Sequence, residues 1–185
     1  MATKLNVTAA ETGGNPFLRG VAFLSTVCGV AAALMILSAV LITCQMIFVR
    51  FILNHSTIWQ TEMVIYLMVG ATLIGLPYVQ RLRGHVNVDL IPLMLPQGLR
   101  KLLAIVTLCV TIIVVLIMLI YGFELWHIAF QRGWTSDTVW GVRLAIPYIA
   151  MPIGFSLFIL QLIADLYAVV TNIDKPFGLQ TGEAE

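Results

Sequence analysis

The side chains that could carry out chemistry in this chain of 185 residues are few and scattered. The three histidines lie in or beside the expected loops, so no two of them can hold a haem between facing helices. The three cysteines stand singly in apolar stretches, without the spacing of a redox or zinc motif. No nucleophile has a neighbouring base, and no glycine-rich phosphate loop occurs. We therefore expect no catalysis, no cofactor and no metal site. The three histidines are His55, His85 and His127, and the three cysteines are Cys28, Cys44 and Cys109.

Composition defines the class of protein. Hydrophobic residues make up 60% of the chain and charged residues 10%, whereas a soluble domain has roughly 45–50% and about 25%. The mean hydropathy is +0.98. A formal net charge of +1 without a basic run argues against a nucleic-acid partner. The composition predicts an integral membrane protein whose surroundings are the lipid bilayer.

Four uncharged stretches divide the chain, each near or above the length that crosses about 30 Å of hydrocarbon as a helix. Helices are required because lipid offers no partner to unpaired backbone groups. The predicted fold class is an all-α membrane protein with four transmembrane helices. The predicted organisation is a polar tail (1–16), a membrane domain (17–170) with spans at 21–49, 63–80, 102–123 and 144–168, and a second polar tail (171–185).

The distribution of basic residues predicts the orientation of the spans. With four spans, both tails and the segment between the second and third spans lie on one side of the membrane. Cytoplasmic segments carry the excess of Lys and Arg, so we expect both termini in the cytoplasm. That side would hold Lys4, Arg19, Arg81, Arg83, Arg100, Lys101 and Lys175, against Arg50, Arg132 and Arg143 on the other side.

The segment between the second and third spans contains a compact polar motif of Arg81, Gly84, His85 and Asp89. Prolines interrupt the apolar run that follows, which excludes a further span and predicts a short segment in the membrane interface. The arginines would reach anionic headgroups. If the motif is helical, His85 and Asp89 can pair across one turn. An interfacial anchor and a contact with a partner protein both fit this pattern.

The second span is expected to begin with a capping box, in which Thr57 is the N-cap and Gln60 reaches back to it. Glu62 would then lie in the first turn, where the helix dipole favours an anion. A docking role for Glu62 is the alternative. The last loop, 124–143, contains three tryptophans, which fit an aromatic belt at the membrane surface or a protein-docking surface.

Small residues repeat at helical spacing in the first two spans. Close approach through such residues is a main source of attraction between helices in lipid. We expect these faces to meet another helix, either in this chain or in a partner. Because the spans carry no ionisable group at membrane depth, the chain fits a scaffold or accessory subunit. The packing candidates are Ser25, Cys28, Gly29, Ala32 and Ala33 in the first span and Ala71 and Gly75 in the second.

One ordered set of motifs resembles a known family. It comprises Trp59-x-x-Glu62, Gly75, Arg81, the stretch Gly84-His85-Val86-Asn87-Val88-Asp89, Pro96, and the later Ile146-Pro147-Tyr148 and Pro152-Ile153-Gly154. Over about 17–170 the chain is similar to the small, DctQ-like membrane subunit of tripartite ATP-independent periplasmic (TRAP) transporters.

The resemblance implies a small non-catalytic subunit of a sodium-driven importer of an organic acid, in the bacterial inner membrane. It would pack against a large membrane subunit that holds the substrate and sodium sites, and would help to dock a periplasmic substrate-binding protein. A self-contained homodimeric transporter and the membrane anchor of a redox complex are the alternatives. The candidates for periplasmic docking are Arg50, Glu62, Arg132, Asp137 and Arg143.

Overall fold

The computed structural model describes residues 16–82 and 97–171. The tails and the interfacial segment, including Gly84, His85 and Asp89, lie outside this part of the chain. The described helices are α1 (Pro16–Ile52), α2 (Ile58–Arg81), α4 (Gln97–Arg132), α5 (Ala145–Tyr148) and α6 (Ala150–Val170).

Four stretches are helical, long enough and apolar enough to cross a membrane, which confirms the prediction of four such helices but with longer bounds. They are Pro16–Ile52, Ile58–Arg81, Lys101–Arg132 and the combined α5–α6 stretch Ala145–Val170. No strand occurs in the described ranges beyond an isolated bridge between Thr135 and Arg143. The chain is an all-helical, multi-pass membrane protein.

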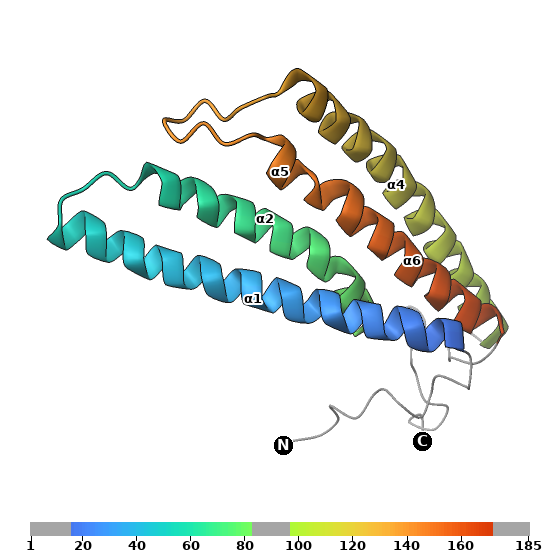
Figure 1. Ribbon diagram of the computed structural model, residues 1–185. Helices are drawn as coiled ribbons and strands as arrows, with labels where there is room; N and C mark the ends of the chain where they lie inside the picture. The colour runs from blue at the N-terminus through green and yellow to red at the C-terminus, as the bar shows by residue number, and fades with distance from the viewer. Residues whose placement is uncertain (1–15, 83–96, 172–185) are drawn as a thin grey trace, which may run out of the picture.

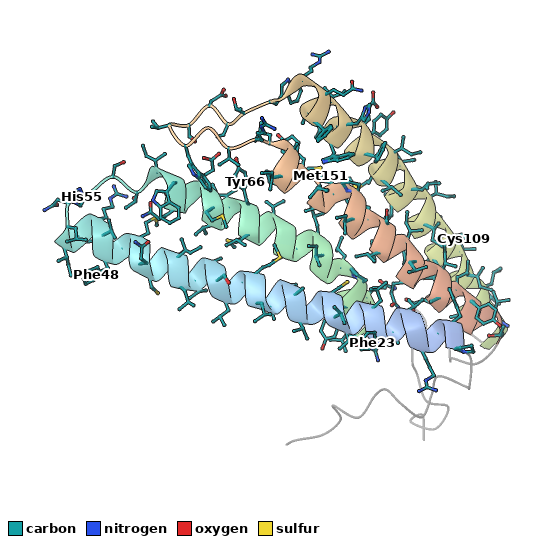
Figure 2. The ribbon with its side chains drawn as sticks, viewed as in Figure 1. Phe23, Phe48, His55, Tyr66, Cys109 and Met151 are labelled. Carbon is teal, nitrogen blue, oxygen red and sulfur yellow. The ribbon has the colours of Figure 1, made fainter. Side chains whose placement is uncertain are left out.

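The long helices lie side by side in the order α1, α2, α6, α4, as a fan (Figure 1). The fan is narrow where α1 and α4 begin and α6 ends, and it widens toward the two connecting loops. At the narrow end Leu18 and Val21 of α1 pack against Ala164 of α6. Side chains such as Phe48, which is 54% exposed, project from the outer edge of α1 (Figure 2). Such exposure of large apolar groups suits contact with lipid or with another membrane protein.

The third membrane helix is longer than predicted. The loop was expected to begin at Glu124, but α4 continues to Arg132. A charge ends the apolar run without ending the helix, since Glu is a good helix former. The residue after the helix is Gly133, whose φ of +61° allows the Trp134 N–H to donate to the Ala129 carbonyl at 3.1 Å. This is the bond of a Schellman C-cap.

The helix of the fourth span is interrupted shortly before Pro152. Pro152 has no N–H to donate to the carbonyl four residues earlier, that of Tyr148. The helix accordingly breaks between α5, which ends at Tyr148, and α6, which begins at Ala150.

The predicted capping box does not form. Thr57 is the N-cap of α2, but its side chain makes no capping hydrogen bond. Gln60 is only 3% exposed, and its Oε1 has no hydrogen-bond partner within residues 16–82 and 97–171. Because Gln60 is packed inside the protein, it does not reach back to the helix start.

Candidate functional site

The wide end of the fan carries a folded loop, residues 133–144, which we call the hairpin. Its two arms are joined by backbone bonds from Ser136 N–H to the Val142 carbonyl (2.8 Å) and from Leu144 N–H to the Trp134 carbonyl (2.9 Å). Gly141, at a φ of +59°, allows the chain to reverse near the tip. The hairpin therefore has a defined shape rather than that of an open connection.

A cluster of hydrogen-bonded side chains fastens the hairpin to α2. Glu62 is 7% exposed, and its Oε2 accepts a hydrogen bond from the Thr138 hydroxyl, 76 residues away in the sequence. The Tyr66 hydroxyl, one turn along α2, donates to Glu62 Oε1. We call Glu62, Tyr66 and Thr138 the Glu62 cluster. It is a charge-assisted contact between two distant parts of the chain.

The interpretation of Glu62 as a first-turn residue was wrong. The helix begins at Ile58, and its first turn contains no acidic residue. The carboxylate is stabilised by the two hydroxyls of the Glu62 cluster, so its buried position has a structural reason. Tyr66 lies four residues after Glu62, a spacing that could have shown this pair in the sequence. The contact with Thr138 had no such local signal.

Aromatic contact adds to the Glu62 cluster. The rings of Trp59, at the start of α2, and Trp140, in the hairpin, lie 6.2 Å apart at 58°. Offset and tilted ring pairs of this kind contribute about 0.5–1.5 kcal/mol beyond the area that they bury. Beside them, Val139 is 91% exposed at the tip of the hairpin. A polar and an aromatic contact thus hold a loop that presents an apolar tip.

Four of the five docking candidates lie on the surface near this end: Arg50, at the end of α1, Arg132, at the end of α4, and Asp137 and Arg143, in the hairpin. Three cations and one anion are accessible there to a partner. Glu62 lies below this surface and contacts the hairpin. The arrangement can present charge and shape to another protein, with Glu62 as a positioning residue.

Most of the packing candidates meet inside this chain. Ser25, Cys28 and Ala32 of α1 are buried, as are Ala71 and Gly75 of α2. A Cβ added at Gly75 would lie 3.3 Å from the Cβ of Ala32. The small residues thus let α1 and α2 approach each other closely.

The two remaining candidates of α1 differ from each other. A Cβ at Gly29 would clash with the ring of Tyr78, so the tyrosine ring occupies the space that the glycine leaves. Ala33 is exposed. Gly29 therefore belongs to the contact between α1 and α2, and Ala33 remains accessible from outside.

The narrow end contains polar contacts that the sequence reading missed. The Arg81 guanidinium, expected to reach headgroups, donates through Nη1 to the Ala22 carbonyl at 2.7 Å and to the Thr26 hydroxyl. Asp165 of α6 accepts from Gln80 of α2 at 3.0 Å and from Gln161 at 2.8 Å. The spacing of residues 161 and 165 was a usable signal for the second bond. These contacts join α2 to both of its neighbours.

Within the described residues, no three His, Cys, Asp or Glu side chains lie close enough to hold a metal ion. The polar groups that come together, in the Glu62 cluster and around Asp165, hold helices and loops in place.

Comparison with known proteins agrees with the resemblance in the sequence. The family model for the DctQ component of tripartite ATP-independent periplasmic transporters matches residues 39–172. The chain is also 22% identical, over 153 residues, to the C4-dicarboxylate TRAP transporter small permease protein DctQ of Vibrio cholerae. That match covers 71% of this chain and 66% of the relative, just under two thirds of its length.

Proposed function

The chain belongs to the family of DctQ components of TRAP transporters, and from this premise we propose that it is the small, non-catalytic scaffold subunit of a sodium-driven importer of an organic acid. Its partner in the membrane is a large subunit that holds the substrate and sodium sites. The observation that carries the proposal is the family match over most of the four apolar spans. The proposed location is the bacterial inner membrane, with both termini in the cytoplasm.

The proposed role in the membrane follows from the shape of the chain. Helices arranged side by side bury less apolar surface than helices in a closed bundle. In the most apolar window of α4, 11% of the residues are buried within the chain. Such a helix offers a long apolar face to a second membrane protein, and van der Waals packing along that face would hold the two together.

The proposed role outside the membrane uses the hairpin and the charges beside it. With both termini in the cytoplasm, the hairpin and residues 53–57 face the periplasm. Arg50, Arg132, Asp137 and Arg143 would then steer a periplasmic binding protein toward the transporter, since complementary charge mainly raises the association rate. Glu62 would hold the hairpin in the orientation that this contact needs.

Reconstitution in liposomes tests the proposed function. A large TRAP membrane subunit from the same organism is co-expressed and purified with this chain, and uptake of candidate organic acids is measured with the binding protein and an inward sodium gradient. We expect uptake from the complete system and none from this chain alone. Uptake by this chain alone, or failure of the two membrane proteins to co-purify, would overturn the proposal.

A further inference from the structure

Three of the membrane helices each contain a residue that weakens the helix. Pro77 of α2 and Pro152 of α6 have no N–H, so the carbonyls of Leu73 and Tyr148 lack the donor that a regular helix supplies. Gly122 lies inside α4, and glycine is the poorest helix former after proline. Each of these helices therefore has a point at which it bends more easily than elsewhere.

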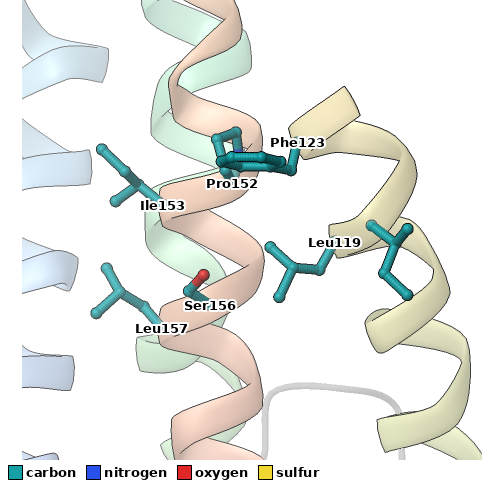
Figure 3. A pocket seen from close by; sticks show the side chains of 7 residues that line it. Leu119, Phe123, Pro152, Ile153, Ser156 and Leu157 are labelled. Atoms are coloured by element: carbon teal, nitrogen blue, oxygen red, sulfur yellow. The ribbon is translucent and has the colours of Figure 1, made fainter. Parts of the chain in front are cut away.

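The first turns of α6 bring the three weak points together. A Cβ added at Gly154 would lie 2.7 Å from the carbonyl oxygen of Leu73, the carbonyl that Pro77 leaves without its donor. A Cβ added at Gly122 would lie 3.3 Å from the Cβ of Met151. Pro152 lines the groove between α6 and α4 at the same place (Figure 3). We call residues 151–154 of α6, with Leu73 and Gly122 against them, the crossing.

The crossing divides the fan into a narrow half and a wide half that are held together differently. Both clusters of buried apolar side chains found in residues 16–82 and 97–171 lie in the narrow half. One joins the start of α1 to α6, and the other consists of Val115, Phe158 and Leu162. The hydrogen bonds of Arg81 and Asp165 join helices of the same half. Because buried contacts oppose local opening, the narrow half resists deformation.

The wide half is held mainly by contacts within itself. The Glu62 cluster and the pair of Trp59 and Trp140 join α2 to the hairpin, and Ala129, near the end of α4, is fully buried. No residue of α1 after Ala39 is buried, so α1 packs less closely against this half. The start of α2, the hairpin, α5 and the end of α4 can therefore move as one unit.

We propose that the crossing is a hinge about which the wide half pivots relative to the narrow half. Hinges are a few residues that absorb a change in φ and ψ while the parts on either side keep their contacts, and here the missing backbone bonds allow that change. One consequence rests on the proposed function: the hairpin could follow a bound periplasmic protein without disturbing the buried clusters of the narrow half.

Distances between spin labels test the pivot in the full-length chain in lipid nanodiscs. Cys44→Ser and Cys109→Ser remove the two exposed thiols. One pair of labels joins Val139, in the hairpin, to Leu102, near the start of α4; both side chains are exposed. The control pair joins Leu102 to Phe23 of α1, so that both labels lie in the narrow half. We expect the hairpin pair to give a distance distribution about twofold broader than the control pair. Equal widths would overturn the hinge.

Proline substitutions separate the hinge from motion of the label itself. Pro77→Ala combined with Pro152→Ala supplies both missing N–H groups. The width for the Val139–Leu102 pair should then fall about twofold, toward that of the control pair, which should not change. The matched control is Pro147→Ala in α5, because Pro147 lies in the first turn of its helix, where an N–H has no partner within the helix.

The outcomes distinguish the hinge from the proposed function, since the distances are measured without the large subunit. An unchanged width in the double variant, or the same narrowing in Pro147→Ala, contradicts the hinge alone. Absence of uptake by the unmodified complete transporter contradicts the proposed function alone. If the double variant does not accumulate, the comparison of the two label pairs in the chain with its native prolines decides.

Discussion

Replacing Thr138 with valine removes one hydroxyl from the Glu62 cluster and changes the side-chain shape very little. Thr138 donates to Glu62 Oε2 at 2.5 Å. Hydrogen bonds to charged groups contribute about 1.5–3 kcal/mol, and removing one leaves a buried acceptor with fewer partners. We take the lower value because Thr138 is exposed on its outer side. About 1.5 kcal/mol corresponds to roughly a tenfold change in an equilibrium.

That equilibrium is between the hairpin fastened to α2 and the hairpin released from it. Amide exchange measures it, because the N–H groups of Ser136 and Leu144 are protected by the bonds that define the hairpin. In Thr138→Val these amides should exchange about tenfold faster, since exchange follows the free energy of local opening. The control is Thr135→Val, which changes a threonine of the same hairpin that lies outside the Glu62 cluster.

Two results would refute this reasoning. Unchanged exchange in Thr138→Val would mean that Glu62 does not hold the hairpin. Equal acceleration in Thr135→Val would mean that any loss of a hydroxyl loosens the loop. If exchange accelerates as expected, a smaller fraction of molecules has the hairpin fastened to α2. If the binding protein recognises only that fraction, its affinity should fall in proportion, by up to about tenfold.

Two further predictions concern helix contact and docking. Gly29→Ala should destabilise the chain by about 1–3 kcal/mol, because the new methyl group meets the Tyr78 ring; a thermal melt in detergent measures this, with Gly20→Ala, which has open space around it, as the control. Reversing the charge of Arg132 and Arg143 together should slow association of the binding protein at low salt and have little effect at high salt. Stopped-flow binding at two ionic strengths checks the second prediction, and a rate that salt does not alter would contradict it.

The four spans could be predicted from sequence because the membrane acts on each segment separately. A helix of apolar residues satisfies its own backbone wherever it lies in the bilayer, so length and composition are enough. Helix ends were less predictable. Glu124 marked the end of the third apolar run, but α4 continued to Arg132, and the positive φ of Gly133 stops it. Hydropathy indicates which residues lie in lipid, whereas the end of a helix depends on local backbone geometry. The end of an apolar run therefore does not locate the end of the helix.

The contacts of the candidate site could be predicted only where both residues lie on the same helix. Residues with a neighbour one turn away could be paired by spacing, as Glu62 with Tyr66 and Gln161 with Asp165. The bond from Thr138 to Glu62 joins residues 76 positions apart, and the bond from Gln80 to Asp165 joins residues 85 positions apart. These contacts follow from the arrangement of whole helices.

The sequence by itself determined that the chain lies in a membrane, that it crosses as four helices, and that it belongs to the DctQ components. Each of these depends on local composition or on an ordered set of motifs. Only the tertiary structure decided which small residues are used within the chain and why Glu62 is buried. Lipid solvates every apolar face alike, so the choice of neighbours is made by the shapes of the packed helices.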